Sequence, residues 1–207
     1  MGVGSGAMGR TGGVLLAAWV CAAFLPARTL FALHPALMAV GFGALMLEGI
    51  LAALALQPLA GKERVQAIKY HQILMNLALA CILVGFYAIY SNKERNGKPH
   101  FVSWHGLGGL ATVVLAAGAF VGGLFSFRAL GLMPLLPTFL QTRIKTIHKF
   151  AGAVTFHCGT ASLISGFLRP TMARGATTYL WVLLTAVNAA FVVRTAVLAN
   201  RKSSSKV

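Results

Sequence analysis

Long uninterrupted apolar runs are the feature that most constrains how this chain can fold. A helix needs about 17–25 mostly apolar residues to cross the hydrocarbon core of a bilayer, and the 207-residue sequence contains several runs near that length. We count six, at approximately 12–25, 31–56, 70–90, 101–127, 150–168 and 177–193. None of them alternates apolar and polar residues as the strands of a membrane β-barrel do. The sequence therefore predicts an all-α integral membrane bundle of six transmembrane helices.

The first run is the shortest, and two interpretations of it stay open. Arg10 followed by a short apolar core resembles the start of a signal peptide. We favour an uncleaved helix, because no clear small-residue cleavage site precedes Pro26. In either case we expect residues 1–207 to form a single membrane domain with its core at about 31–168. The basic tail, residues 200–207, is expected to be solvated and disordered.

The distribution of basic residues predicts the orientation in the membrane. We define side A as the side that holds the 25–31 and 91–100 loops, and side B as the opposite side. Side A then carries Arg28, Lys93, Arg95, Lys98, Arg169 and Arg174. Side B carries twice as many: Arg10, Lys62, Arg64, Lys69, Arg128, Arg143, Lys145, Lys149, Arg194, Arg201, Lys202 and Lys206. By the positive-inside rule side B, with both termini, faces the cytosol.

The net charge of +15 does not indicate a nucleic-acid partner. The charge is spread over loops beside membrane spans, where basic residues attract anionic lipid head groups and small anions. We therefore expect membrane lipid and small anions, and no nucleic acid, as partners.

Four of the six histidines lie a few residues inside consecutive spans. Because successive spans run in opposite directions, His34 and His105 should lie near side A, and His71 and His148 near side B. A hydrogen bond to a neighbouring helix is the ordinary explanation for any single membrane histidine. Matched depths on four consecutive spans favour a shared function, since ionisable side chains in membrane spans are uncommon and usually functional.

Two opposed imidazoles with nothing else polar nearby fit the axial ligands of a six-coordinate haem iron. Zinc would need ligands clustered at one point, commonly with a carboxylate or a thiolate. The sequence has no CxxCH motif for covalent haem attachment, and we interpret Cys21, Cys81 and Cys158 as buried free thiols. One haem near each face would provide a path for electrons across the membrane.

Small residues follow two of these histidines along the same helix face. The fifth span has His148, Gly152, Thr155, Gly159, Ser162 and Gly166, and the fourth has His105, Gly109, Thr112, Ala116 and Ala119. Such stripes allow close helix packing, and they equally leave room for a flat macrocycle. We expect the cofactors to contact Gly109, Thr112, Gly152, Thr155 and Gly159.

The stretches ALHPALMA, KYHQILMN, SWHGLGGL and TIHKFAGA resemble the four histidine motifs of the cytochrome b561 family. The resemblance runs from about 31 to 168, and the layout is most similar to the small six-helix branch; the first and last spans match only in hydropathy. It implies two non-covalent b-type haems with bis-histidine ligation, one on His34 and His105 and the other on His71 and His148. The second to fifth spans would form the four-helix core that holds them.

The same resemblance implies a transmembrane ascorbate-dependent oxidoreductase of an endomembrane. Electrons would pass from cytosolic ascorbate to monodehydroascorbate or a ferric chelate on the other side. The family has a substrate-contacting lysine at the position of Lys69, two residues before His71. Other cations expected near the ascorbate anion are Arg64, Arg143, Lys145 and Lys149, although positive-inside charge alone would also explain them.

The sequence at the side A site departs from the family pattern. Related proteins often have a histidine where this chain has Asn92. We expect His100 and Lys98 to offer a donor and a cation to the outer substrate in its place, and an ordinary interfacial histidine is the alternative for His100.

Two other intramembrane residues carry separate expectations. His157 should be a helix-packing residue. Glu48 should hydrogen-bond near the cytosolic haem or accept a proton there, with a salt bridge to a loop lysine as the alternative.

Three other functions stay open. They are a dihaem quinol-oxidising membrane subunit, a haem-free proton-coupled transporter and a non-catalytic scaffold. The matched histidine depths argue against the scaffold, and the sequence leaves open whether two copies form a homodimer.

Overall fold

The computed structural model describes the backbone of residues 3–127, 130–170, 172 and 175–204, and the side chains of 11–127, 130–170, 172 and 175–198. Within these ranges every regular element is a helix. Four helical segments are long and apolar enough to cross a membrane: Leu30–Leu54, Gly61–Arg95, Trp104–Ser126 and Ala176–Leu198. The prediction of an all-α membrane bundle is confirmed, and the number of six crossings stays a prediction.

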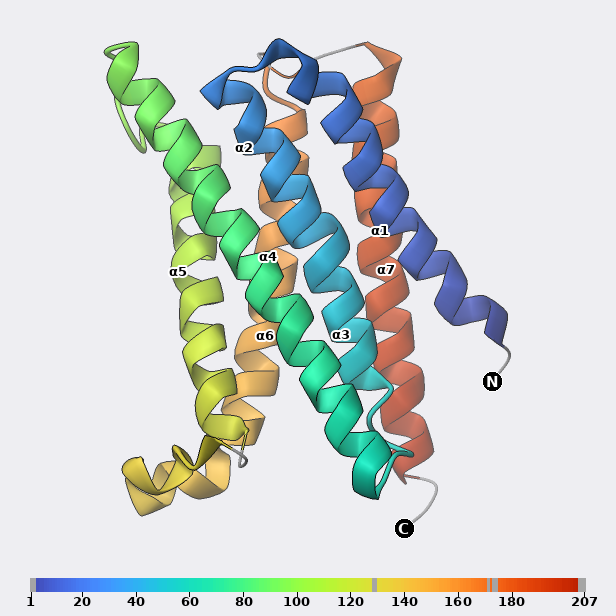
Figure 1. The fold of residues 1–207 in the computed structure, drawn as a ribbon. Coiled ribbons are helices and arrows are strands. Elements are labelled where there is room, and N and C mark those ends of the chain that lie inside the picture. The colour runs from blue at the N-terminus through green and yellow to red at the C-terminus, as the bar shows by residue number, and fades with distance from the viewer. Residues whose placement is uncertain (1–2, 128–129, 171, 173–174, 205–207) are drawn as a thin grey trace.

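The helices stand side by side, with side A at the top of Figure 1. In chain order they are α1 (Val3–Phe24), a continuous rod of α2 (Leu30–Met38), η2 (Ala39–Met46) and α3 (Leu47–Leu54), then α4 (Gly61–Arg95), α5 (Trp104–Ser126), α6 (Thr138–Phe167) and α7 (Ala176–Ser204). The second rod packs along α1 and α4, α5 packs along α6, and α7 packs against α1 and α6. This arrangement places the second rod at the centre, where it supplies much of the buried apolar core.

Three helices extend well beyond the apolar runs that predicted them. α4 begins at Gly61 and α6 at Thr138, each on polar residues outside the expected span. α7 continues to Ser204, so the tail predicted to be disordered from residue 200 is helical up to that point; residues 205–207 lie outside the described residues. Extending a formed helix adds a hydrogen bond for each residue fixed, so polar ends can continue a helix that an apolar stretch has begun.

The second rod contains a π-helical segment, Ala39–Met46, which the apolar pattern did not predict. Pro35 interrupts the regular hydrogen bonding just before it, because proline has no backbone N–H. A π-helical segment changes the direction of the side chains that follow it. Phe42, in the middle of this segment, is buried, and a Cβ added to Gly159 of α6 would lie 2.5 Å from its ring. The ring thus packs into the space that Gly159 leaves.

The connection from α4 to α5 is short and tightly held. Gly97 has a φ of 60° and follows the end of α4, where the Lys98 amide donates to the Lys93 carbonyl at 3.0 Å. This is the glycine-terminated helix end of the Schellman type. Ser103 caps α5 by accepting a hydrogen bond from the Gly106 amide at 3.2 Å.

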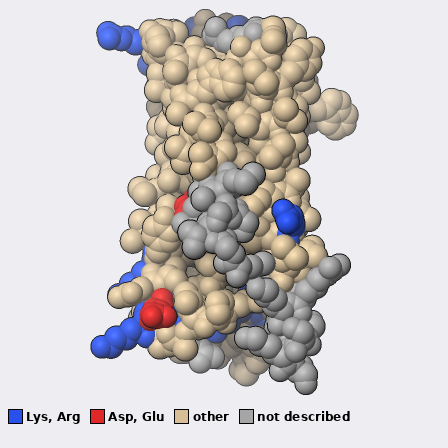
Figure 2. Space-filling view, turned by 90° about the vertical axis from the view of Figure 1, so that its right-hand side faces the viewer, with Lys and Arg blue, Asp and Glu red and all other residues tan. Residues whose placement is uncertain are grey.

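Charged side chains on the face drawn in Figure 2 gather at its top edge and in its lower half, with an uncharged region between them. This distribution is expected of a protein whose middle lies in lipid. Among the basic residues counted on the two sides, the side chains of Arg10, Arg128, Arg174, Arg201, Lys202 and Lys206 lie outside the described residues.

Candidate functional site

The four histidines meet in two pairs, each formed across two helix rods. His34 of α2 faces His105 of α5, with ring centroids 6.2 Å apart and ring planes at 75°. His71 of α4 faces His148 of α6, with centroids 6.3 Å apart and planes at 82°. Connectivity alone predicted these two pairs.

The separation of the rings fits a single metal ion between each pair. An imidazole nitrogen lies about 1.1 Å from its ring centroid and about 2.0 Å from a bound first-row metal, so trans imidazoles have centroids about 6.2 Å apart. Both observed separations agree with this value. Two histidines in hydrogen-bond contact would lie closer than this. The described residues contain no cluster of three or more His, Cys, Asp or Glu side chains that could hold a metal, so each pair supplies two protein ligands.

Hydrogen bonds fix the tautomer of three of these rings through backbone carbonyls. The Nδ1 atom of His34 lies 3.0 Å from the Gly85 oxygen, that of His71 lies 2.7 Å from the Gly49 oxygen, and that of His148 lies 3.0 Å from the Ala119 oxygen. A carbonyl only accepts, so Nδ1 carries the hydrogen and Nε2 keeps its lone pair. This is the tautomer that ligates a metal through Nε2.

His105 reaches the same state through a hydroxyl. Its Nδ1 lies 3.1 Å from Ser165 Oγ, which donates its own hydrogen to the Ser162 carbonyl at 3.0 Å. Ser165 therefore accepts from His105. Each of the four histidines therefore has a carbonyl or hydroxyl partner for its ring N–H group.

Glycines press against the rings from the facing helix. A Cβ on Gly166 of α6 would lie 2.9 Å from Cε1 of His105, and a Cβ on Gly123 of α5 would lie 3.0 Å from Cε1 of His148. Both distances are shorter than ordinary carbon contacts. The two helices therefore hold one another's histidine, and each needs a glycine at the point of contact.

A cavity of about 400 Å³ opens between His34 and His105. This volume falls within the usual range of ligand sites, about 300–1,000 Å³. We call it the outer cavity. Apolar residues from α2, α4 and α6 form most of its wall, and polar residues lie toward side A. Both imidazoles of the first pair line this cavity, so a ligand inside it would meet both rings.

Of the five small residues expected to contact cofactors, three line the outer cavity and two do not. Gly109, Thr112 and Gly159 line the outer cavity. A Cβ on Gly109 or Gly152 would meet nothing within 4 Å, so both leave open space beside their histidines. Gly159 differs, since its open face is filled by Phe42. Thr112 and Thr155 are buried and donate to backbone carbonyls of their own helices, so neither hydroxyl is left unpaired.

The residues expected at the outer substrate site gather in the loop above this cavity. Asn92, Lys98 and His100 all line it, together with Lys93. His100 donates a hydrogen bond from Nε2 to Glu94 Oε1 at 2.7 Å and stacks on Tyr90 with ring centroids 4.2 Å apart. The loop continues into Phe101, whose φ of 53° is rare for a residue with a side chain. His100 is thus held as part of a fixed cover over the cavity.

On side B the expected cations are exposed around the second histidine pair. Lys69 lies half a turn before His71 on α4, and Arg143, Lys145 and Lys149 lie on α6 around His148. Arg64 has a structural contact instead, since its guanidinium donates to the Leu56 carbonyl at 2.6 Å and secures the turn after α3.

Glu48 lies next to Gly49, whose carbonyl holds His71. Its carboxylate accepts a hydrogen bond of 3.3 Å from the hydroxyl of Tyr70, the neighbour of His71. The expectation of a hydrogen bond near this histidine pair is confirmed.

The expectation for His157 was wrong. Its side chain is exposed, and its Nδ1 bonds at 2.7 Å to the Ala153 carbonyl of its own helix.

Several contributors to the site were not predicted. Gly49, Gly85, Gly123 and Ser165 support the histidines, and Arg169 lines the outer cavity. A glycine inside an apolar span is a weak signal of close approach, and four of the spans carry several. Which of these glycines meets an imidazole depends on the rotation of the facing helix.

Comparison with known proteins agrees with the geometry. Residues 33–174 match the model of the family described as eukaryotic cytochrome b561. The chain is 35% identical to transmembrane reductase CYB561D2 of Bos taurus over 147 residues, and equally so to that of Homo sapiens. In both cases 68% of this chain and 62% of the relative are covered. A more distant relative is the lysosomal membrane ascorbate-dependent ferrireductase CYB561A3 of Mus musculus, 32% identical over 96 residues, which are 46% of this chain and 38% of the relative.

The matched region covers less than two thirds of the length of these relatives. Within this chain it includes all four paired histidines and the helices that carry them, from α2 to α6. The chain belongs to the eukaryotic cytochrome b561 family.

Proposed function

We propose that this protein carries electrons across a membrane through two b-type haems. His34 and His105 hold the outer haem, and His71 and His148 hold the cytosolic one. One observation carries the proposal: the four imidazoles form two pairs with the ring spacing expected of two histidines on opposite sides of one metal ion. In every ring Nδ1 has a hydrogen-bond partner. A bound haem would supply the reversible one-electron chemistry of its iron.

The protein itself would position the haems and shield the space between them from water. The Nδ1 hydrogen bonds hold the ring orientations and leave each Nε2 with its lone pair, so the four histidines could ligate a bound iron. Such outer partners also raise the basicity of a ligating histidine. Buried apolar residues, among them Phe42 and Ile82, lie between the two ends and exclude water from the path. No nucleophile or general base is needed for electron transfer.

The donor on side B is ascorbate, and the acceptor on side A is monodehydroascorbate or a ferric chelate. Support for the donor comes from the exposed cations Lys69, Lys145 and Lys149 beside the cytosolic pair, since ascorbate is an anion at neutral pH. The relatives, a transmembrane reductase and an ascorbate-dependent ferrireductase, support the same reaction. We also propose that side B faces the cytosol, which the excess of basic residues there supports. In this proposal six helices cross the bilayer, and the membrane is an endomembrane.

The proposal is tested by the visible difference spectrum of the purified protein, ascorbate-reduced minus oxidised, measured together with haem per chain. We expect two b-type haems that ascorbate reduces promptly. A colourless protein would refute the haem assignment, and would leave the histidines to a proton-coupled transporter. Prompt reduction by quinol and poor reduction by ascorbate would instead support a quinol-oxidising subunit.

Histidine variants test the pairing. His71→Ala or His148→Ala should lose the cytosolic haem and keep the outer one. His157→Ala is the matched control, because this histidine lies on α6 between the two sites and is exposed. Retention of two haems per chain in His148→Ala would contradict the assignment.

A further inference from the structure

A second hollow lies beside the outer site. This side pocket has a volume of about 520 Å³ and is lined by Val102, Ser103, Trp104, His105, Ser165 and Arg169, with Leu107. It shares four lining residues with the outer cavity, and Trp104, Leu107 and Ser165 line the side pocket alone; the shared residues are Val102, Ser103, His105 and Arg169. The side pocket therefore adjoins the outer cavity and extends beyond it on the side of His105 that Trp104, Leu107 and Ser165 line.

The side pocket lies on the face of His105 turned away from the outer cavity. Ser165, which accepts the Nδ1 hydrogen of His105, lines the side pocket and not the outer cavity. His34 shows the reverse, lining only the outer cavity. A haem held through Nε2 would therefore leave free the part of the side pocket that Ser165 lines, and a molecule there would contact the edge of a haem ligand.

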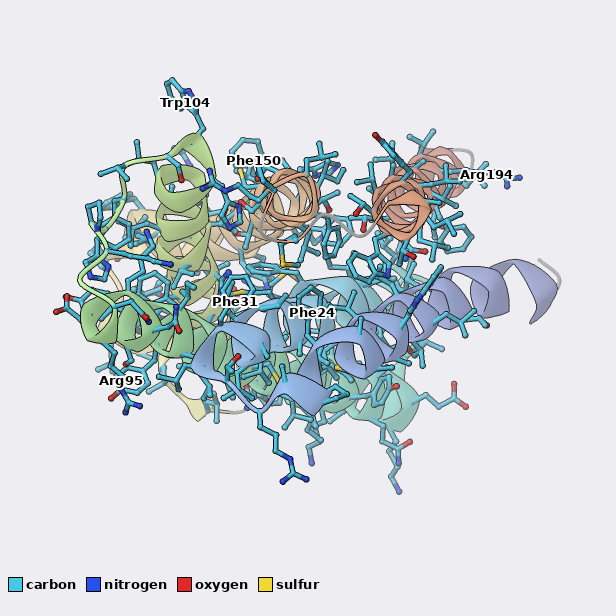
Figure 3. The ribbon with its side chains drawn as sticks, turned by 90° about the horizontal axis from the view of Figure 1, so that it is seen from above. Phe24, Phe31, Arg95, Trp104, Phe150 and Arg194 are labelled. Carbon is cyan, nitrogen blue, oxygen red and sulfur yellow. The ribbon has the colours of Figure 1, made fainter. Side chains whose placement is uncertain are left out.

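The pocket opens toward the outside of the bundle at the end of side A. Its rim is Trp104, which is 91% exposed and points away from the helices in Figure 3, and Val102, which is 72% exposed. Trp104 begins α5, and Arg169 follows the end of α6. Both therefore lie at the level where tryptophan and arginine mark the boundary between lipid and water.

Among the described residues that line the pocket, Arg169 carries the fixed charge and determines what the pocket would bind. Arg169 offers a planar set of donors, which matches the two oxygens of a carboxylate. Trp104, Leu107 and Val102 add an apolar wall but no acceptor groups. The chemistry of the pocket thus fits a small polycarboxylate anion.

We propose that the side pocket is the docking site for the electron acceptor, and that the acceptor is a ferric polycarboxylate chelate held by Arg169. This inference rests on the proposed function, because it needs an outer haem as the electron source. A bound outer haem would supply one electron, which would reduce the chelated ferric ion to ferrous. One electron moves, and no covalent bond or proton is exchanged.

The location differs from the one that the sequence predicted. His100 is bound to Glu94 and stacked on Tyr90, and it covers the cavity that a haem would fill. The side pocket reaches His105 by a route that the cover does not block.

Arg169→Gln tests the proposal in the full-length purified protein. We expect the KM for ferric citrate to rise about tenfold, the usual effect of losing a hydrogen bond to a charged group. Reduction of the haems by ascorbate and haem per chain should not change. Arg95→Gln is the matched control, since Arg95 also lies on side A but projects away from the bundle and lines neither space (Figure 3).

A second measurement does not depend on electron transfer. Gallium citrate has the charge of ferric citrate but is not reduced, so equilibrium binding of radiolabelled gallium citrate reports docking alone. Binding should weaken in Arg169→Gln and in Leu107→Trp, which fills the pocket, and should persist in Arg95→Gln.

Three outcomes would overturn the docking site. They are unchanged gallium citrate binding in both pocket variants, an equal loss in Arg95→Gln, and loss of one haem in Arg169→Gln, which would make the arginine a haem anchor. A protein that binds gallium citrate as expected but contains no haem would instead refute the proposed function and leave an anion site.

Discussion

Replacing Gly166 by alanine should disturb the outer histidine pair without touching any proposed ligand. The new Cβ would lie 2.9 Å from Cε1 and 3.5 Å from Nδ1 of His105. Ordinary contact begins at 3.4 Å, so the ring or the helix must move by about 0.5 Å. A functional constellation tolerates displacements of only about 0.5 Å. The substitution should therefore displace His105 by about the largest distance at which it could still ligate a metal.

The energy of this change can be worked from two parts. Overpacking by one methyl group costs about 1–3 kcal/mol. Weakening the hydrogen bond from His105 to Ser165 adds about 1 kcal/mol. Loss of an outer hydrogen bond to a metal-ligating histidine typically lowers metal affinity about 10–100-fold. We expect the outer haem to bind weakly and the cytosolic haem to bind as before.

Haem per chain and a potentiometric titration of the purified variant provide the assay. Gly166→Ala should retain close to one haem, or show a shift in only one of two midpoint potentials. Gly108→Ala is the control, because its Cβ would meet nothing within 4 Å. Two haems with both potentials unchanged in Gly166→Ala would show that the glycine contact does not position His105.

Three further predictions concern other residues of the bundle. Gly123→Ala should affect the other haem, because its Cβ would lie 3.0 Å from His148; loss of the outer haem from this variant would contradict the assignment of the pairs. Lys69→Ala should slow the reduction of haem by ascorbate in stopped-flow measurements without loss of haem. Lys62→Ala, at the start of α4, should leave this rate unchanged. Equal rates in the two variants would show that Lys69 serves only to orient the protein in the membrane. Phe42→Ala should lower the free energy of unfolding by about 3 kcal/mol, the lower range for removing a buried phenylalanine, since its ring fills the space at Gly159; an unchanged melting temperature in detergent would show that this contact contributes little.

Hydropathy and connectivity determined the broad plan of the molecule. The apolar runs predicted helices because lipid leaves no other partner for the backbone of a single span. The alternating direction of those spans then placed His34 with His105 and His71 with His148. Neither step needs knowledge of packing, and both spatial pairs are present in the structure.

The helix ends and the π-helical segment could not be derived in the same way. Apolar runs locate the part of a helix that lies in lipid, whereas α4 and α6 continue through polar residues outside it. The register change at Ala39–Met46 depends on how Phe42 fits against Gly159, a contact between residues far apart in the chain.

The support of the histidines was decided by the tertiary structure alone. Many glycines and serines in these spans look equivalent along the sequence. Ser165 and Gly166 matter because the rotation of α6 turns them toward His105, and Arg169 matters because the end of α6 lies beside the start of α5. A one-dimensional pattern fixes depth in the membrane and the direction of each span, but the rotation of one helix against another is set by side-chain packing, and that rotation determines which residues hold the rings.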